Sequence, residues 1–427
     1  MKLSNYNLSL DIEDKCAVYN TISRKYVLFD GSKKEYVNSL LKDLSRDKYE
    51  VSEGELLKEF IRAGIIVDDN LNEFDKITYL FNKVKYQENR FILIISPTLD
   101  CNFRCPYCFE ERRDSYITDE AVEGVIELVK KVSKKVKVLQ VCWFGGEPML
   151  QFEKIKTMTK VFKEICEKEG VSYCSTMTTN GYLLNDEIIE ELKALGIKKF
   201  QITLDGHREF HNKKRPLADG TGTFDKVLDN IIKASRKDIA VTLRINVDKE
   251  NADSIPELLD SIPEDIRKKV VVNICNIFQN KEMIPLADYF KAALSKGYQF
   301  RFFRKNYEIC EGTFINSITV QPDGKVTPCQ MCNEKGFNFG KLRKDGTLNI
   351  TKPSEFYKFR TTSAIDNESC KKCSKFPLCL GGCYYNRYKN NKACVGTNYG
   401  GIDLEDFIKL EIYNDVAQGL VKEIEIE

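Results

Sequence analysis

Residues 101–108 read Cys-Asn-Phe-Arg-Cys-Pro-Tyr-Cys and closely follow the apolar run Phe91–Ile95. The spacing puts Cys101, Cys105 and Cys108 on one short loop, where three thiolates can face the same small cluster. Because only three ligands are supplied, one iron of a four-iron cluster would stay open to a small molecule, as the open position of a catalytic zinc does. The alternative is a structural zinc knuckle, which the lack of a local fourth ligand disfavours.

Length and composition predict an ordinary globular protein. The chain has 427 residues, enough for two or three domains, with 42% hydrophobic and 30% charged residues. Its 66 basic and 64 acidic residues give a charge of +2, so electrostatics offer no reason to expect nucleic acid or a membrane surface as a partner. We find no apolar run of the roughly 20 residues that a membrane helix needs. Since Met1–Ser9 also lacks the layout of a secretory signal, a cytoplasmic protein is expected.

Sixteen cysteines in such a chain need an explanation, because disulfides do not persist in the cytosol. The chain has only two histidines, His207 and His211, and thiolates without imidazole favour iron–sulfur clusters or all-cysteine zinc. Five cysteines stand singly in apolar or helical contexts and are predicted to be small buried hydrophobes: Cys16, Cys142, Cys166, Cys174 and Cys275.

The middle of the chain, from Phe91 to about Phe278, alternates strands and helices. The predicted strands are Phe91–Ile95, Val138–Cys142, Cys174–Thr178, Lys199–Thr203, Ala240–Ile245 and Val270–Ile274, and the predicted helices include Thr118–Val132 and Asp186–Leu195. Such alternation predicts an α/β fold with a mostly parallel sheet, compatible with an open or partial barrel. Ligands of these folds collect at the carboxyl ends of the strands.

The first part of the chain predicts a small winged-helix-like module. Short strands at Ala17–Tyr19 and Tyr26–Phe29 precede helical spacing in Tyr36–Leu44 and Leu56–Ile61, where the second helix follows a capping box at Ser52–Glu55. Ile65–Val67 reads as a further strand before a charged linker. The edge of the hairpin could accept an added strand from a peptide.

The last part of the chain loses the regular alternation from about Met283 and is predicted to end in an amphipathic helix, roughly Leu404 to Ile424. The expected domains are therefore residues 1–88 for the N-terminal module, 89–282 for the partial barrel and 283–427 for a cysteine-rich domain.

The cysteine loop resembles the signature of the radical S-adenosylmethionine (SAM) superfamily, which has Cys-x3-Cys-x2-Cys with an aromatic residue before the third Cys. The resemblance extends through the whole middle region. It implies a partial (β/α)6 barrel and a 4Fe–4S cluster on Cys101, Cys105 and Cys108 whose open iron binds SAM. Reductive cleavage of SAM would then give a 5′-deoxyadenosyl radical that abstracts hydrogen from the substrate.

Polar residues at the ends of successive predicted strands match the places where the family binds SAM. A glycine pair allows close backbone approach, a carboxylate accepts from an ammonium, and an arginine fork suits a carboxylate. Each residue alone would read as a loop cap or surface ion pair, and only their shared placement favours cofactor binding. The residues implied are Tyr107, Gly145, Gly146, Glu147, Pro148, Thr179, Asn180, Thr203, Asp205, Arg215, Arg244 and Asn246.

The C-terminal cysteines resemble the seven-cysteine SPASM extension of radical SAM peptide maturases, which carries two auxiliary 4Fe–4S clusters. The resemblance assigns Cys310, Cys329 and Cys383 to the first auxiliary cluster, with Cys332 as a candidate fourth ligand, and Cys370, Cys373, Cys379 and Cys394 to the second. A zinc ribbon made from residues 370–383 is the alternative, and it would leave Cys310, Cys329 and Cys394 unused. Three 4Fe–4S clusters are thus expected.

The implied function is maturation of a ribosomally made precursor peptide, whose leader the N-terminal module would bind. An electron donor such as flavodoxin or ferredoxin would serve the clusters. Residues 303–306 lack the cysteine that often completes the first auxiliary cluster, so an open iron could hold a substrate thiolate and favour a thioether product.

Other functions stay open at this stage. Within the same chemistry they are carbon–carbon or carbon–oxygen cross-linking and epimerisation, and outside it a non-catalytic metal scaffold that binds peptides. Sulfatase maturation is disfavoured because Gln330 stands where those maturases carry a catalytic Asp. The catalytic base is not assigned; the candidates for the pocket are Asp205, Gln330, Glu110, Tyr384 and Tyr385.

Overall fold

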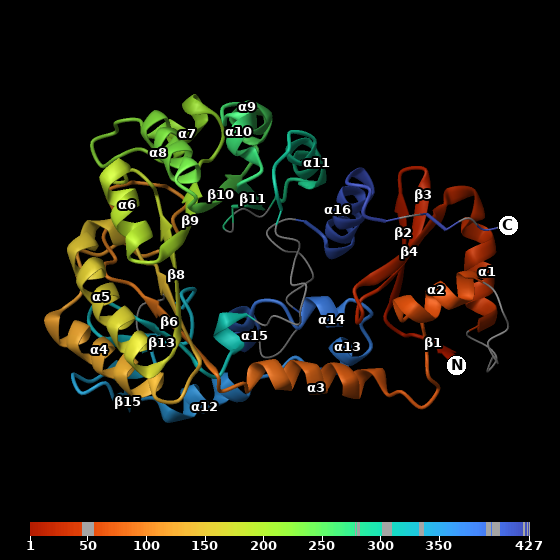
Figure 1. The fold of residues 1–427 in the computed structure, drawn as a ribbon, viewed down its shortest axis with the longest axis horizontal. Coiled ribbons are helices and arrows are strands. Elements are labelled where there is room, and N and C mark those ends of the chain that lie inside the picture. The colour runs from red at the N-terminus through yellow and green to blue at the C-terminus, as the bar shows by residue number, and fades with distance from the viewer. Residues whose placement is uncertain are drawn as a thin grey trace. The chain divides into compact units, whose positions relative to one another are not determined.

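The structure is a computed structural model of residues 1–427 (Figure 1). It describes all of them except 45–54, 278, 280–281, 301–309, 333–336, 390–393, 395–401, 422, 425 and 427. The chain divides into two compact units, the first made of Met1–Lys85, Phe302–Ile309 and Thr362–Glu427, the second of Tyr86–Arg301 and Cys310–Thr361. Among the helices of the described residues, none is both long and apolar enough to cross a membrane.

The second unit is built on one ten-stranded sheet with the strand order β11-β10-β9-β8-β7-β6-β12-β13-β14-β15. Neighbours from β6 to β11 are parallel throughout. The bounds are β6 Arg90–Ile95, β7 Val138–Trp143, β8 Ser172–Thr179, β9 Ile197–Thr203, β10 Ala240–Val247 and β11 Val270–Asn276. These strands confirm the six predicted from the sequence and the α/β fold class.

Helices separate the parallel strands, and Figure 1 shows them on the outside of the curved sheet. Strand residues such as Leu93, Leu139, Val141 and Leu243 are fully buried and form the core with the apolar faces of these helices. The helices are α4 Asp119–Ser133, α5 Phe152–Glu169, α6 Asp186–Ala194, α7 Arg208–Lys214, α8 Phe224–Arg236, α9 Ile255–Asp260, α10 Glu264–Arg267 and α11 Ala287–Ser295.

The sheet continues into the cysteine-rich part of the sequence. Strand β12 (Ser317–Val320) lies parallel to β6, with Ile318 opposite Leu93. β13 (Lys325–Thr327), β14 (Gly340–Leu342) and β15 (Leu348–Ile350) follow as antiparallel neighbours, and α12 spans Pro353–Thr361. The sequence analysis missed these strands because three or four residues are too few to show a period of two.

The first unit contains the antiparallel sheet β2-β3-β4, formed by Asn7–Ile12, Lys15–Asn20 and Lys25–Asp30. Helices α1 (Lys34–Leu44) and α2 (Glu55–Ala63) cover one face of it, where Val37 and Phe60 pack with residues of β3 and β4. Helix α16 (Leu404–Ala417) packs its apolar side against the other face. The other elements are β1 Lys2–Leu3, β5 Ile66–Val67, α3 Glu73–Lys85, α13 Glu368–Lys371, α14 Phe376–Cys379 and α15 Tyr384–Lys389.

The first unit differs from the sequence-based predictions at two places, and a third prediction falls almost wholly outside the described residues. The predicted linker after Val67 is wrong, since Phe74, Ile77 and Phe81 give α3 an apolar face that packs in this unit. The predicted terminal helix is too long, because α16 ends at Ala417 and Gly419 follows with a φ of +65°. The capping box at residues 52–55 lies almost wholly outside the described residues.

Candidate active site

The cysteine loop leaves the carboxyl end of β6 and is fixed by short-range hydrogen bonds. The Asp100 carboxylate accepts from the Cys101 backbone N–H at 2.8 Å and from the Tyr116 hydroxyl at 2.8 Å. Cys101 and Cys105 are half-buried and Cys108 is exposed. Burial raises the pKa of the Cys101 thiol to about 12, and the negative charge of Glu147 adds to this. A cation bound at the site would favour loss of this proton, because it stabilises the thiolate.

The Gly145–Pro148 turn at the end of β7 packs directly against the cysteine loop. The Glu147 backbone N–H donates to the Asp100 carbonyl at 2.8 Å, and a Cβ on Gly146 would lie 2.6 Å from the Asp100 carbonyl carbon. The glycine is therefore required by the close approach of the neighbouring strand-end loop. This backbone contact holds the cysteine loop over the sheet.

The Glu147 side chain connects the ends of β7 and β8. It is fully buried and accepts from the Thr179 hydroxyl at 2.6 Å, the Asn180 backbone N–H at 2.7 Å and the Met149 backbone N–H at 3.0 Å. The Asn180 side chain in turn lies 3.8 Å from the Cys101 sulfur. Glu147 thus positions the β8 turn beside the predicted cluster ligand, while burial raises the pKa of its carboxyl.

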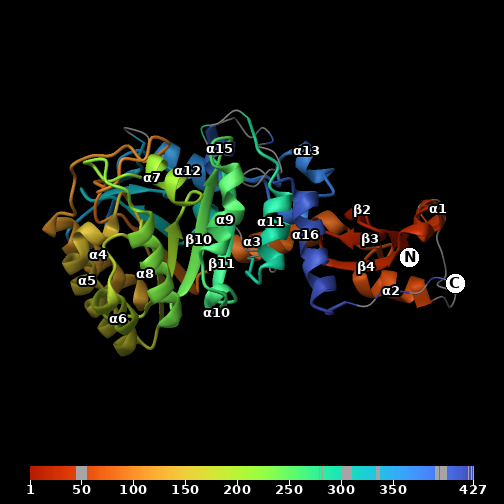
Figure 2. The ribbon, with the colours of Figure 1, turned by 90° about the horizontal axis from the view of Figure 1, so that it is seen from above.

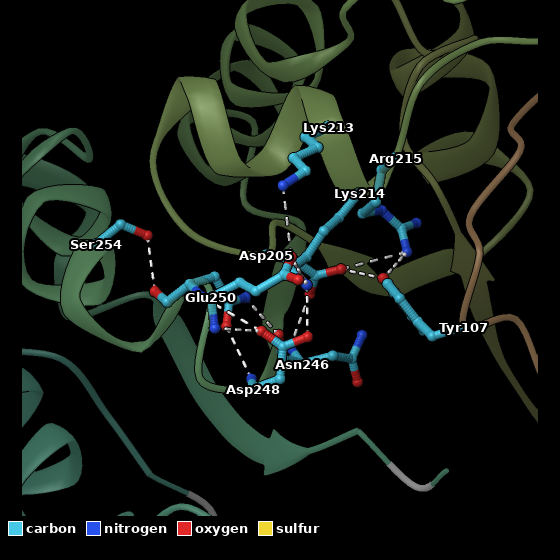
Figure 3. Close-up of polar contacts among 10 residues, drawn as sticks. Tyr107, Asp205, Lys213, Lys214, Arg215, Asn246, Asp248, Glu250 and Ser254 are labelled. Atoms are coloured by element: carbon cyan, nitrogen blue, oxygen red, sulfur yellow. Dashed lines mark hydrogen bonds and ion pairs between the residues drawn. The ribbon is translucent and has the colours of Figure 1, made fainter. Parts of the chain in front are cut away.

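Asp205, after β9, is the centre of the polar network in Figure 3. Its fully buried carboxylate accepts from the Tyr107 hydroxyl and from the Asn246 backbone N–H at 2.7 Å. Arg215 lies 3.7 Å from the same carboxylate and donates to the Tyr107 hydroxyl at 2.8 Å. Tyr107 stands between Cys105 and Cys108, so this network fixes the cysteine loop to the ends of β9 and β10. With its oxygens so engaged, Asp205 has the contacts of a positioning residue.

His211 contacts this network through the Asp205 backbone and the Thr223 side chain. Its Nδ1 accepts from the Asp205 backbone N–H at 3.1 Å, and its Nε2 lies 3.0 Å from the Thr223 hydroxyl, which itself donates to the Arg215 carbonyl at 2.7 Å. These partners select the neutral tautomer with the proton on Nε2. Burial lowers the pKa of His211 well below its usual value, and the charge of Arg215 adds to this.

A pH dependence of stability follows from the buried neutral imidazole. In the unfolded chain the imidazole binds a proton as the pH falls below about 6.5, whereas the folded protein keeps it neutral. The free energy of unfolding should therefore fall by about 1.4 kcal/mol per pH unit below that value. We expect His211→Gln, which keeps an acceptor and a donor, to lose this slope in urea titrations between pH 5 and 7. The control His207→Gln should retain it; an unchanged slope in His211→Gln would contradict the assignment.

The other predicted SAM residues lie around the same strand ends. Thr203 ends β9 and Arg244 is its register partner in β10. The Arg244 Nε donates to the Asn246 side chain at 2.9 Å. Arg215 stacks over the Phe103 ring, with 5.5 Å from the guanidinium carbon to the ring centre, and its buried Nε has no hydrogen-bond partner within the described part of the chain. An unpaired buried donor beside the cysteine loop fits an anionic group such as the SAM carboxylate.

Three of the predicted auxiliary ligands gather in the second unit. The sulfurs of Cys329 and Cys332 lie 3.4 Å apart in buried positions, and this contact lowers the pKa of the Cys329 thiol. A Cβ on Gly312 would lie 3.6 Å from the Cys329 sulfur and 3.9 Å from the Cys310 sulfur. Cys332 thus lies next to one of the predicted ligands, and its role as fourth ligand stays a prediction. Cys383 belongs to the other unit, so its share in this cluster stays a prediction.

The predicted ligands of the second auxiliary cluster lie in the first unit, where Cys373 and Cys394 are electrostatic neighbours of Cys370. The sequence analysis missed Arg387, whose fully buried guanidinium lies 3.7 Å from the Cys370 sulfur and donates to the Gly381 carbonyl at 2.8 and 3.0 Å. It is four residues after Cys383 on α15, and this helical spacing was the available signal. A buried cation here suits an anionic thiolate cluster.

The five cysteines outside the predicted cluster motifs differ in their exposure to solvent. Cys16, Cys166 and Cys275 are buried as predicted, Cys142 is half-buried, and Cys174 is exposed on β8, so the prediction is wrong for Cys174. In the part of the chain that the structure describes, no three Cys, His, Asp or Glu side chains are grouped for a single metal ion.

Among the candidate bases, Tyr384 and Tyr385 are buried in the first unit, and Gln330 and Glu110 are half-buried in the second.

Comparisons with known proteins agree with these features. Residues 95–262 match the model of the radical SAM superfamily, and residues 299–374 match SPASM, an iron–sulfur cluster-binding domain. GTP 3′,8-cyclase of Clostridium perfringens is 32% identical over 181 residues, or 42% of this chain and 53% of that relative, so the match spans about half of its length.

Two similar solved structures share the fold. The structure of anSMEcpe with bound AdoMet and the Cp18Cys peptide has a TM-score of 0.56 at 19% identity, covering 78% of this chain and 100% of that one. Streptococcus suis SuiB bound to the precursor peptide SuiA has a TM-score of 0.51 at 16% identity, covering 91% and 96%. Both domain matches confirm the radical SAM and SPASM domains inferred from the cysteine motifs. The chain carries a radical SAM domain and a SPASM iron–sulfur cluster-binding domain.

Proposed function

We propose that this chain is a radical SAM maturase that modifies a ribosomally made precursor peptide. The observation that carries the proposal is the three-thiol loop fixed over the carboxyl ends of β6 to β10, beside which the Arg215 Nε has no hydrogen-bond partner among the described residues. Cys101, Cys105 and Cys108 would hold a 4Fe–4S cluster, which when bound supplies the electron that cleaves SAM reductively to a 5′-deoxyadenosyl radical.

The chain's own residues would orient SAM beside that cluster. Arg215 would bind its carboxylate, the Gly145–Gly146 backbone would accept from its amino group, and Thr203, Arg244 and Asn246 would line the ribose. Tyr107, Asp205 and Glu147 would hold these groups in place through the buried contacts described above. Cys310, Cys329 and Cys383, with Cys332 as a candidate fourth ligand, would carry one auxiliary cluster, and Cys370, Cys373, Cys379 and Cys394 the other.

The substrate class is supported by the two structural neighbours described above, both of which were solved with a peptide bound. The leader of the precursor would bind the N-terminal module, and flavodoxin or ferredoxin would deliver electrons. A thioether between a cysteine sulfur and a carbon of the same peptide is the proposed product.

A second product is favoured by one observation. Cys332 lies 3.4 Å from Cys329 and can complete the first auxiliary cluster, which would leave no open iron for a substrate thiolate. Carbon–carbon or carbon–oxygen cross-linking needs no such thiolate and is the alternative. Mass spectrometry of the product separates the possibilities, since a cross-link removes two hydrogens and epimerisation removes none. A thioether also consumes a thiol that iodoacetamide would otherwise alkylate.

Formation of 5′-deoxyadenosine tests the shared chemistry. The anaerobically reconstituted chain should produce it from SAM after reduction with dithionite, and Cys105→Ala should abolish production because one of three ligands is lost. Cys174→Ala removes an exposed cysteine outside the predicted clusters and should leave the rate unchanged. A wild-type chain that binds only zinc, or leaves SAM intact, would refute the proposal.

A further inference from the structure

The loop of residues 248–254, hereafter the β10 loop, follows strand β10, which Figure 2 shows between the helices α8 and α9. Asp248 fixes the shape of this loop. Its Oδ1 accepts from the Glu250 N–H at 2.9 Å and from the Asn251 N–H at 3.3 Å, and the Asp248 N–H donates to the Asn251 side-chain oxygen at 2.8 Å. The second carboxylate oxygen of Asp248 is therefore free to contact another element.

That contact is made by Lys214, the last residue of α7. The Lys214 Nζ lies 2.5 Å from Asp248 Oδ2 and 3.3 Å from a carboxylate oxygen of Glu250 (Figure 3). The Lys214 side chain is 8% exposed and that of Asp248 is 15% exposed. Because a buried ammonium needs a charged partner, this ion pair holds the end of α7 against the β10 loop.

Each member of the ion pair is connected to a residue of the proposed SAM site. Lys214 directly precedes Arg215, the proposed partner of the SAM carboxylate. On the other side, the fully buried Asn251 donates from Nδ2 to the Asn246 carbonyl at 2.8 Å, and Asn246 is proposed to line the ribose. The ion pair therefore fixes the backbone at Arg215 relative to the backbone at Asn246.

This connection is separate from the one made by Asp205. The Asp205 carboxylate contacts the Arg215 guanidinium and the Asn246 N–H, so it acts within the site itself. Lys214 and Asp248 act outside it, through the end of a helix and the shape of a loop. Two independent contacts thus determine how far apart the two proposed SAM-binding residues lie.

We propose that Lys214 and Asp248 are positioning residues for SAM, whose buried ion pair sets the spacing of Arg215 and Asn246. The inference rests on the proposed function, because SAM is the ligand of those two residues. Without the ion pair, the last turn of α7 and the β10 loop can shift independently. The groups that bind the two ends of SAM are then no longer held at a fixed separation, and affinity falls.

Equilibrium dialysis of SAM against the anaerobically reconstituted, unreduced chain tests the proposal. Lys214→Met keeps the length of the side chain and removes the ammonium, so the dissociation constant for SAM should rise about 10-fold. The matched control is Lys213→Met, since the Lys213 side chain is 74% exposed and its Nζ is 3.8 Å from Glu250. This control should bind SAM as the wild type does. Iron analysis ensures that equally loaded preparations are compared.

A second variant separates positioning from stability. Lys214→Met leaves the Asp248 charge without its buried partner and should also lower the free energy of unfolding. Lys214→Met/Asp248→Asn removes that charge and keeps the oxygen that accepts from the loop N–H groups. It should regain stability in urea titrations and still bind SAM weakly. If Lys214→Met does not fold, the double variant alone is compared with the wild type.

Recovery of SAM affinity together with stability in the double variant would overturn the proposal, as would wild-type affinity in Lys214→Met. Either result, with a wild type that binds SAM, would leave the proposed function standing. A wild type that holds its iron but does not bind SAM would instead refute the proposed function, and this inference with it.

Discussion

Asp205→Asn should lower the free energy of unfolding by about 3–5 kcal/mol and reduce the iron that the chain holds after reconstitution. Asp205 accepts from the Tyr107 hydroxyl and the Asn246 N–H and faces the Arg215 guanidinium. An amide would turn a donor toward one of these donors and leave the buried guanidinium without its counter-charge. Because Tyr107 lies between two cluster cysteines, the damage should extend to the cysteine loop.

Denaturant titration and iron analysis of the same preparations would measure both effects. Asp265→Asn is the matched control, since it removes a carboxylate that pairs with Arg236 at 3.2 Å but is 57% exposed. An exposed pair contributes at most about 1 kcal/mol, and iron content should not change. Equal losses in the two variants would show that Asp205 has no special role.

Gly146→Ala should lower the free energy of unfolding by a similar amount, through packing alone. Its Cβ would lie 2.6 Å from the Asp100 carbonyl carbon and 2.8 Å from that of Leu99, and both are backbone atoms that cannot turn aside. The β7 turn and the cysteine loop would have to separate, at a cost of about 3 kcal/mol or more. We expect a lower unfolding midpoint and loss of 5′-deoxyadenosine formation.

Gly170→Ala controls for the glycine-to-alanine change itself. Gly170 ends α5 with a φ of +66°, and a Cβ there would meet nothing within 4 Å. Its cost should be the conformational penalty of about 1 kcal/mol, with normal SAM cleavage. If Gly146→Ala were as mild as Gly170→Ala, the close approach of the two loops would not be needed for function.

The sequence predicted those parts of the molecule whose physical signal is local. Six parallel strands alternate with helices long enough to show their period, and the observed strands extend the predicted ones by at most two residues at either end. The cysteine spacing predicted a cluster-binding loop after β6 for the same reason, since the three predicted ligands lie within residues 101–108.

Contacts between distant segments could not be read in this way. The neutral His211 behind Asp205, the Arg387 guanidinium beside Cys370 and the position of Cys332 next to Cys329 all depend on the folded chain. The strand β2 and the short strands β12 to β15 were missed because pairing, rather than intrinsic pattern, defines them. The predicted terminal helix extends beyond Ala417, where α16 ends, because the apolar residues that follow fit a helical period as well as an extended one.

The parallel pairing of β12 with β6 bears on how the enzyme is made in the cell. β6 leads into the cysteine loop, yet its second neighbour is synthesised only after the rest of the parallel sheet. A nascent chain that has emerged only as far as β11 therefore presents β6 with one side bare, and such an edge invites mispairing. We expect iron–sulfur insertion to wait until translation has passed Val320, and a gene fragment that stops at Asn276 to give aggregated product.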